Sequence, residues 1–346
     1  MSSGKSSERE EVSFLLNLLE RYSPTRSVEE ARGYLVDKLR EYGLKPTVLS
    51  RGGILCQGGG RRRVLLCGHL DTVPGMIPVR FDGRILSGRG VVDAKGPLAA
   101  IVQALRLSVD HMDLGYVLIV SVDEEGRSVS TIEALERCRD GFMGAVVGEP
   151  SRTHGVTVSY YGMMAVEAFI QFKPMHPSAS AWFGDPMERL FRFSITVSDR
   201  LRSRIGRKVV IQPIRSDRAQ DYCRLSMEVR YPQDAGETVR STLSEASKEF
   251  ECEFRVLTDV PPYTTPEDAE VLLRMLNSIR ASGLEPRLVR KTSTSDMNII
   301  GALYGVPCVA YGPGNPRLSH TWYERIRIQD YLKSVEVLCR FLKGNF

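Results

Sequence analysis

The sequence has 346 residues, of which 42% are hydrophobic and 26% charged, and these proportions exclude wholesale disorder. The formal net charge of +5 is spread along the chain without an aromatic and basic stripe, which argues against a nucleic-acid-binding protein. The apolar runs are far shorter than the roughly 20 residues of a membrane span, and the polar first residues lack the apolar segment of a secretion signal. Seven cysteines without a Cys-x-x-Cys pair argue against a disulfide framework or a thiolate zinc site. We therefore expect a cytoplasmic protein that binds neither nucleic acid nor membrane.

Short apolar strands alternate with amphipathic helices in the first part of the chain. Residues 12–19 and 27–42 have the apolar spacing of helices, and the glycine- and arginine-rich stretch 51–63 is typical of a loop. The elements predicted beyond it are a strand at 64–68, a helix at 97–109, a strand at 116–122, a helix at 128–138 and a strand at 145–148. Such alternation is typical of an α/β domain with a largely parallel sheet.

The alternation of buried strands and helices stops after about residue 160 and resumes near residue 261. The elements predicted between these points are strands at 164–172, 224–231 and 253–257 and helices at 186–199 and 237–250. This order resembles β-α-β-β-α-β, an antiparallel α+β module of the ferredoxin-like type. The elements predicted after it are a helix at 266–281, a strand at 308–311 and a helix at 329–342. We expect an α/β catalytic domain with a mixed, largely parallel sheet at 1–159 and 260–346, and an inserted α+β domain at 160–259.

Histidine and acidic motifs occur where the predicted strands end. They are His69-Leu-Asp71, Asp93, the pair Glu124-Glu125, Glu149 and, much later in the chain, His320. In open α/β sheets ligands bind beyond the carboxyl ends of the strands, so these loops can converge on one site. Two imidazoles and three carboxylates supply enough ligands for two divalent ions that share one bridging carboxylate. The absence of a thiolate favours zinc, cobalt or manganese.

The spacing within these motifs indicates different roles for neighbouring side chains. Side chains two residues apart on an extended segment face the same side, so Asp71 can hold the second ring nitrogen of a metal-ligating His69. Glu124 and Glu125 face different directions, so one can bind metal while the other acts as the general base.

Each motif also has an ordinary structural interpretation. A Glu-Glu pair is usually solvated surface, and an isolated His-x-Asp is more often incidental than catalytic. Five such motifs in order, each beside a predicted strand end, nevertheless favour a metal site. His111 lies in a polar connection and His154 closely follows Glu149 in a loop, so neither is included in the ligand set.

Three longer stretches resemble the dinuclear-metal aminoacylase/carboxypeptidase superfamily, which includes acetylornithine deacetylase, succinyl-diaminopimelate desuccinylase and carboxypeptidase G. They are residues 88–97 (GRGVVDAKGP), 286–298 (PRLVRKTSTSDMN) and 311–315 (YGPGN). The resemblance covers nearly the whole chain, from His69 to His320. It implies a zinc-peptidase-like catalytic domain and an inserted domain that serves as a lid and mediates homodimerisation.

The resemblance also implies a ligand set for two divalent ions, with zinc as the expected metal and cobalt as the alternative. Asp93 would bridge the two ions. His69 and Glu149 would complete one site, and Glu125 and His320 the other.

Three further residues receive catalytic roles from the resemblance. Glu124 would be the general base, and Asp71 would orient a histidine ligand. His176 in the inserted domain would reach the active site of a partner subunit and polarise the scissile carbonyl, with a plain surface histidine as the other interpretation.

Within the superfamily the sequence is most similar to the hydrolases that act on the amino-group carrier protein LysW. This similarity implies release of lysine or ornithine from the γ-carboxyl of the carrier's C-terminal glutamate, in lysine and arginine biosynthesis. Arg290 and Lys291, near a turn that contains Ser295, would bind a substrate carboxylate or form a structural ion pair. The basic residues within 51–63 would meet the small acidic carrier or belong to a solvated loop.

Two other functions stay open on the sequence alone. The first is hydrolysis of a different amide within the same superfamily, such as acetylornithine, succinyl-diaminopimelate or a dipeptide. The second is a non-catalytic metal-binding scaffold, which the complete set of ligands and base disfavours.

Overall fold

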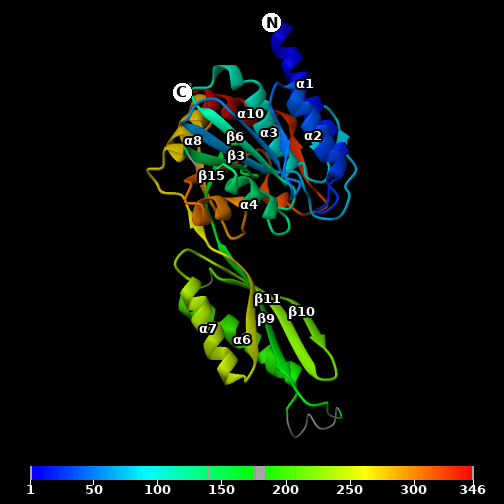
Figure 1. Cartoon of the computed structure of the whole chain (residues 1–346), viewed down its shortest axis with the longest axis vertical. Helices are drawn as coiled ribbons and strands as arrows, with labels where there is room; N and C mark the ends of the chain where they lie inside the picture. The colour runs from blue at the N-terminus through cyan, green and yellow to red at the C-terminus, as the bar shows by residue number, and fades with distance from the viewer. Residues whose placement is uncertain (1, 139–140, 175, 177–183, 207, 345–346) are drawn as a thin grey trace. The chain divides into compact units, whose positions relative to one another are not determined.

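The computed structural model of the chain describes residues 2–138, 141–174, 176, 184–206 and 208–344. The backbone forms two compact units, each with its own hydrophobic core (Figure 1). The first unit comprises Met1–Val158, Thr265–Arg290 and Ile299–Phe346, and the second comprises Ser159–Thr264 and Lys291–Asn298. None of the helices among the described residues combines the length and hydropathy needed to cross a membrane.

The described residues form a nine-stranded main sheet. Its strands follow the order β1 (Thr47–Val48), β2 (Ile54–Gly58), β6 (Gly115–Ser121), β3 (Arg63–His69), β7 (Phe142–Gly148), β15 (Cys308–Tyr311), β8 (Gly155–Tyr160) and β13 (Tyr263–Thr264), and β14 (Arg287–Lys291) pairs with β8. The four central strands β6, β3, β7 and β15 are parallel, whereas the strands beyond them pair antiparallel. The predicted α/β class with a mixed, centrally parallel sheet is confirmed, and the carboxyl ends of the central strands meet at one edge.

Helices bury the apolar faces of this sheet. The helices of the first unit are α1 (Ser2–Glu20), α2 (Glu29–Glu41), α3 (Lys95–Arg106), α4 (Val129–Glu136), α8 (Glu270–Ala281) and α10 (Ile328–Lys343). Helix α3 packs against β3 and β7. Helices α1 and α10 pack against α3, and Figure 1 shows α3 and α10 side by side. All seven residues of β6 are buried, as expected of a central parallel strand that is covered on both faces.

Several short elements lie between the longer helices and strands. A small three-stranded sheet has the order β16 (Arg325–Arg327), β5 (Ile85–Ser87) and β4 (Arg80–Phe81). The remaining short elements are the 3₁₀ turns η1 (Val109–His111) and η4 (Pro316–Leu318), helix α9 (Asp296–Asn298) and the π-helical turn η3 (Ile299–Leu303).

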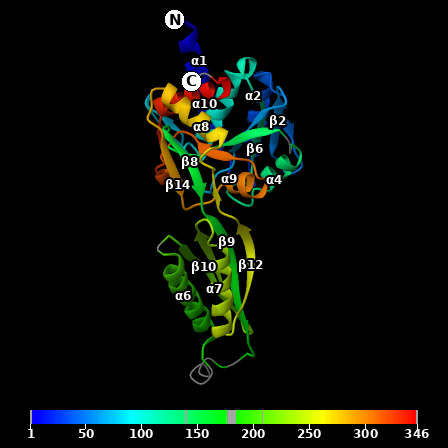
Figure 2. The same cartoon turned by 90° about the vertical axis from the view of Figure 1, so that its left-hand side faces the viewer.

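The second unit has the predicted ferredoxin-like order of elements. These are β9 (Gly162–Gln171), α6 (Pro186–Ile205), β10 (Val210–Arg218), β11 (Tyr222–Tyr231), α7 (Gly236–Glu249) and β12 (Glu253–Val260). Its antiparallel sheet has the order β10-β11-β9-β12. Strand β11 alternates buried and half-exposed residues, and Figure 2 shows α6 and α7 against the sheet, so their apolar faces close the core.

The structure differs from the sequence predictions in three places. The stretch 51–63 is not all loop, because the buried run Ile54–Cys56 pairs with β6 as strand β2. Strand β10 was not predicted, since most of its side chains are exposed and no alternation marks it. Lys291–Asn298, which the predicted boundaries put in the catalytic domain, belongs to the second unit, where Asn298 donates hydrogen bonds to the backbone oxygens of Tyr161 and Pro261.

Candidate metal centre

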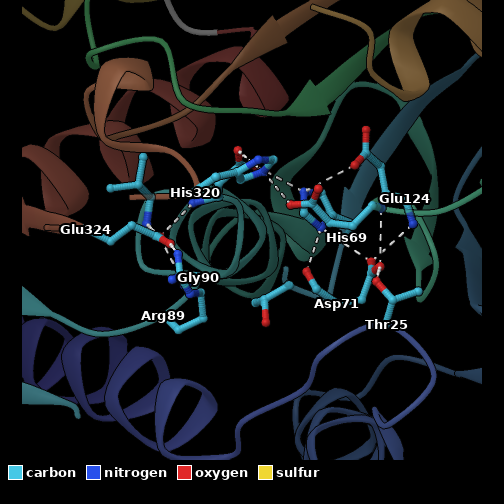
Figure 3. Close-up of polar contacts among 12 residues, drawn as sticks. Thr25, His69, Asp71, Arg89, Gly90, Glu124, His320 and Glu324 are labelled. Atoms are coloured by element: carbon cyan, nitrogen blue, oxygen red, sulfur yellow. Dashed lines mark hydrogen bonds and ion pairs between the residues drawn. The ribbon is translucent and has the colours of Figure 1, made fainter. Parts of the chain in front are cut away.

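The candidate site lies in the first unit, where its parallel strands end (Figure 3). The predicted side chains come from His69 at the end of β3, Glu124 and Glu125 after β6, Glu149 after β7, Asp93 between β5 and α3, and His320 between η4 and β16. Because β3 pairs with both β6 and β7 in parallel, the loops that follow these three strands start at the same edge of the sheet. The topology therefore brings together residues as far apart in the chain as His69 and His320.

Asp93 lies between the two histidines. Its Oδ1 is 3.4 Å from His69 Nε2, and its Oδ2 is 3.4 Å from His320 Nε2. The His69 side chain is only 2% exposed, whereas that of His320 is 50% exposed. Each oxygen of one carboxylate therefore faces a different imidazole, which is the arrangement that suits a bridging ligand.

Three glutamates complete the cluster. Glu125 Oε1 is 2.8 Å from His320 Nε2, and Glu149 Oε1 and Glu124 Oε2 are each 4.0 Å from His69 Nε2. Ligand atoms of His69, Asp93 and Glu125 all lie within 4.8 Å of one another.

The spacing of these atoms fits divalent metal ions. A tetrahedral ion with bonds of about 2.1 Å to nitrogen and oxygen would separate its ligand atoms by about 3.4 Å. The two distances from Asp93 to the histidines, 3.4 Å each, match this value. All the donors are imidazole nitrogens or carboxylate oxygens, a set that suits zinc or cobalt. The donor chemistry and the spacing of Asp93 from the two histidines therefore fit a metal centre, whereas Glu125 lies at hydrogen-bond distance (2.8 Å) from His320.

The concentrated negative charge raises the affinity of the histidines for protons. Hydrogen bonds to Asp93 and Glu125 raise the pKa of His320 to about 10. Burial opposes the charged form of His69, yet hydrogen bonds to Asp71 and Asp93 raise its pKa well above the usual value. Burial likewise opposes ionisation of Asp93, but the two histidines bring its pKa below its usual range. The cluster therefore favours positive charge, which a bound cation would supply.

Asp71 supports the ligands from the side of the sheet. His69 Nδ1 lies 2.9 Å from the backbone oxygen of Asp71 and 3.5 Å from its carboxylate. The buried carboxylate accepts hydrogen bonds from the backbone N–H groups of Glu124 (3.1 Å) and Glu125 (3.3 Å) and from the hydroxyl of Thr25 (2.7 Å) (Figure 3). The main chain of Asp71 thus orients the histidine, and its side chain holds the Glu124-Glu125 turn.

The sequence reasoning missed Glu324 and Thr25, which hold the site together. The Glu324 side chain is fully buried and forms an ion pair with Arg89. The hydroxyl of Thr25 donates a hydrogen bond to Asp71. Glu324 follows His320 by four residues, but this spacing alone does not distinguish it from a surface glutamate. Thr25 carries no recognisable signal, because its partner is 46 residues away.

The other predicted functional residues are divided between the two units. Lys291 and Ser295 belong to the second unit and Arg290 to the first. Lys291 donates a hydrogen bond to the Tyr160 hydroxyl (2.9 Å), Ser295 is buried in its own turn, and Arg290 is exposed. His176, also in the second unit, is exposed. The substrate-binding and catalytic roles of these four residues stay predictions.

The basic residues within 51–63 have different surroundings. Arg62 forms an ion pair with Glu270 (2.5 Å), and the Arg63 guanidinium stacks over the Phe142 ring at 5.3 Å. Arg61 is exposed. A contact of this stretch with a carrier protein stays a prediction.

Fold and site together define the class of protein. A central parallel sheet gathers two histidines and several carboxylates at its carboxyl edge. Carboxylates and imidazoles around a metal, with a spare carboxylate as base, are the components of metal-assisted hydrolysis.

Comparison with known proteins identifies the family. The sequence profile of peptidase family M20/M25/M40 matches residues 65–344. A protein from Pyrococcus horikoshii is 36% identical over 344 residues, which are 98% of this chain and 99% of that protein, and it is named provisionally as a LysW-lysine/LysW-ornithine hydrolase. A protein from Saccharolobus islandicus named LysW-lysine/LysW-ornithine hydrolase is 30% identical over 324 residues, 91% of this chain and 90% of that protein.

Solved structures share the fold of this chain. The crystal structure of a tripeptidase from Staphylococcus aureus superposes with a TM-score of 0.80 at 18% identity and covers 97% of this chain and 98% of the tripeptidase chain. The chain belongs to peptidase family M20/M25/M40, which confirms the predicted superfamily, and it is a hydrolase that acts on amide bonds.

Proposed function

We propose that the chain hydrolyses the amide bond between lysine or ornithine and the C-terminal glutamate γ-carboxyl of the carrier protein LysW, in lysine and arginine biosynthesis. The names of two relatives that match nearly the full length support this substrate. The structural observation that carries the hydrolytic part is Asp93, whose two carboxylate oxygens each lie 3.4 Å from a different histidine.

Two divalent ions, zinc or alternatively cobalt, are proposed for the centre. His69 and Glu149 would hold one ion, Glu125 and His320 would hold the other, and Asp93 would bridge them. When bound, the ions supply Lewis acidity that activates water and polarises the scissile carbonyl.

Glu124 is the proposed general base. Its carboxylate takes a proton from the attacking water as the water oxygen bonds to the carbonyl carbon. When the C–N bond breaks, Glu124 delivers this proton to the leaving nitrogen, so the amino acid departs with a free amino group and the carrier keeps a carboxylate. The hydrogen bond from the Glu124 backbone N–H to Asp71 (3.1 Å) holds the main chain from which this carboxylate extends.

Residues outside the ligand cluster are proposed to bind the substrate. Arg290 and Lys291 would hold a substrate carboxylate, because a guanidinium offers two parallel donors to a carboxylate, and Ser295 would line the same region. His176 of a partner subunit would polarise the scissile carbonyl. Replacing His176 by alanine is then expected to lower kcat more than it raises KM.

The proposed enzyme is a cytoplasmic homodimer. Strand β10 is an edge strand of the second unit's sheet, and it exposes Val210 (41%) and Ile214 (54%). An edge with unpaired backbone groups and exposed apolar side chains is a surface that proteins usually cover, which supports dimerisation through this unit. All seven cysteines are free, which supports a reducing compartment.

Substrate and metal can be tested in one experiment. The protein is stripped of metal with a chelator, reloaded with zinc or cobalt, and incubated with LysW–lysine, LysW–ornithine, acetylornithine, succinyl-diaminopimelate and a dipeptide. Free amino acid is measured by mass spectrometry. The proposal predicts that the carrier conjugates have the highest kcat/KM and that the stripped protein is inactive. A higher kcat/KM for a small amide would show that this amide, and not the carrier conjugate, is the preferred substrate. Full activity without metal would overturn the proposed metal centre.

A further inference from the structure

Glu324 is a buried carboxylate next to the candidate metal centre but outside its ligand set. Its Oε2 accepts hydrogen bonds from three backbone N–H groups of one loop, those of Gly90 (3.0 Å), Val92 (3.1 Å) and Asp93 (3.4 Å). Its Oε1 lies 2.6 Å from Arg89 Nη1 (Figure 3). A single side chain therefore holds the backbone of the loop that presents the proposed bridging ligand.

Arg89 connects the same carboxylate to the loop that carries His320. Its Nη1 also donates to the backbone oxygen of Thr321 (3.1 Å), and its Nε donates to the backbone oxygen of Gly75 (2.8 Å). The guanidinium stacks over the Trp322 ring at 5.5 Å. Arg89 is 4% exposed, so this network lies in a region from which water is largely excluded.

The His320 loop needs such an external constraint. His320 has a φ of 62°, a conformation that non-glycine residues rarely adopt and that persists only where the surroundings enforce it. Its side chain is also half exposed, so packing around the ring does not fix its position. The hydrogen bonds four residues later, at Glu324, are therefore well placed to hold the segment.

A buried ion pair is weak evidence for a purely stabilising role. Desolvation offsets most of the attraction between the charges, and apolar replacements of similar volume are often neutral or stabilising. The specific geometry of the Glu324–Arg89 pair thus calls for a role other than stability.

We propose that Glu324 and Arg89 are positioning residues that lock the Asp93 loop to the His320 loop and thereby set the affinity of the centre for metal. Asp93 donates its backbone N–H to Glu324, and His320 precedes Glu324 on the same segment. The pair therefore fixes the separation of two ligands that would share one ion. This inference rests on the proposed metal centre.

Two variants test the positioning role of Glu324 and Arg89. Glu324→Gln keeps the size of the side chain but leaves the Arg89 guanidinium without a counter-charge. The double variant R89M/E324M removes both charges and replaces them with long apolar side chains, so that the fold can persist without the polar network. For each purified variant, the zinc affinity is measured by competition with a chromophoric chelator, the visible spectrum is recorded with cobalt, and kcat and KM are determined separately.

Both variants are expected to bind zinc at least tenfold more weakly than the wild type and to show an altered cobalt spectrum. The kcat measured at limiting metal is expected to fall and to recover with excess metal, while KM stays within about twofold. A merely structural pair would lower the thermal stability of the metal-free protein but would leave the zinc affinity and the cobalt spectrum unchanged.

The ion pair between Arg106 and Glu11 (3.3 Å) provides a matched control. It joins α3 to α1 and includes a carboxylate that is 4% exposed. The double variant R106M/E11M is expected to keep the zinc affinity of the wild type within twofold, whatever its thermal stability.

Three results would overturn the proposed positioning role of Glu324 and Arg89. The first is a folded R89M/E324M protein with the zinc affinity and cobalt spectrum of the wild type. The second is the failure of both Glu324 variants to fold, which would assign the pair to folding alone. The third is a wild-type protein that binds no zinc or cobalt, which would also remove the proposed centre and is thereby distinguished from the first two.

Discussion

The two units differ in how much of their charge is buried. In the first unit, carboxylates and a histidine are buried at the strand ends, with Asp71 at 0%, His69 at 2% and Glu149 at 7% exposure. In the second unit, the charges lie mainly at the surface in pairs such as Arg204–Glu245 (2.6 Å). Buried charge is costly unless it is paired or binds an ion. The buried charges of the first unit therefore point to an ion-binding centre, whereas most charges of the second unit are solvated.

The largest expected effect concerns Glu124, the proposed general base. Glu124→Gln should lower kcat by about 10²- to 10⁴-fold, because an amide cannot accept the proton of the attacking water. This change corresponds to about 3–5 kcal/mol of transition-state stabilisation. The metal content per chain should be unchanged, since the proposed ligands are all present. Measurements of kcat and metal stoichiometry check both statements, and turnover close to that of the wild type would show that another group is the base.

A pair of core substitutions tests whether the units are energetically separate. Leu118→Ala in the first unit and Leu225→Ala in the second each remove a side chain that is at most 1% exposed. Each should destabilise its unit by about 2–5 kcal/mol, the cost of a large-to-small change in a packed core. Urea unfolding monitored together with metal content is the measurement. Leu225→Ala should leave metal binding unchanged, and loss of metal from this variant would contradict the separation.

The central strands of the first unit were predictable from sequence, but several outer strands, such as β2 and β10, were not. Residues of β3, β6, β7 and β15 form continuous apolar runs because these strands are buried on both sides, so their ends, and the ligands that follow, could be predicted. Strand β10 is mostly exposed, and its residues therefore have no periodic pattern. Its existence follows only from pairing with β11.

The residues that gather at the candidate site could be predicted, and the contacts that support them could not. The motifs around His69 and Asp93 stand next to strand ends or glycines, so their residue types indicate chemistry directly. The hydrogen bond from Gly90 to Glu324 joins residues 234 positions apart, and no local pattern carries that information. The contacts of Asp71 were predictable only in part. Its proximity to His69 follows from their spacing in the sequence, whereas its hydrogen bond with Thr25 depends on the tertiary fold.

Removing one hydrogen-bond donor from the buried carboxylate of Asp71 should have a smaller effect on the stability of the first unit. Thr25→Val keeps the shape of the side chain but deletes the hydrogen bond to Asp71 (2.7 Å). Because hydrogen bonds to charged groups contribute about 1.5–3 kcal/mol, the free energy of unfolding should fall by about this amount. The Glu124-Glu125 turn, which the same carboxylate holds, should become less well fixed, so kcat should fall as well. Chemical unfolding and steady-state kinetics give the two numbers, and Thr25→Ser, which keeps the hydroxyl, is the control.

The matching change in the second unit should have the smallest effect and a defined pH dependence. Arg218→Met deletes the ion pair with Asp185 (2.5 Å), whose side chains are 44% and 27% exposed. The arginine is the main reason that the pKa of Asp185 lies below its usual value. An exposed pair contributes at most about 1 kcal/mol, and the N–H groups of Met187 and Glu188 keep Asp185 as the N-cap of α6.

The sign of this pH dependence follows from the lowered pKa. A carboxyl that is more acidic in the folded protein stabilises it above the unfolded pKa of about 3.9, and the stabilisation is lost as the pH falls through the folded value. The wild type should therefore exceed the Arg218→Met variant in stability at pH 7, and the difference should vanish under strongly acidic conditions. Unfolding curves of both proteins from pH 7 to pH 2.5 measure it. A difference that persists at the acidic end would show that Arg218 stabilises the second unit through the packing of its aliphatic stem, not through its charge.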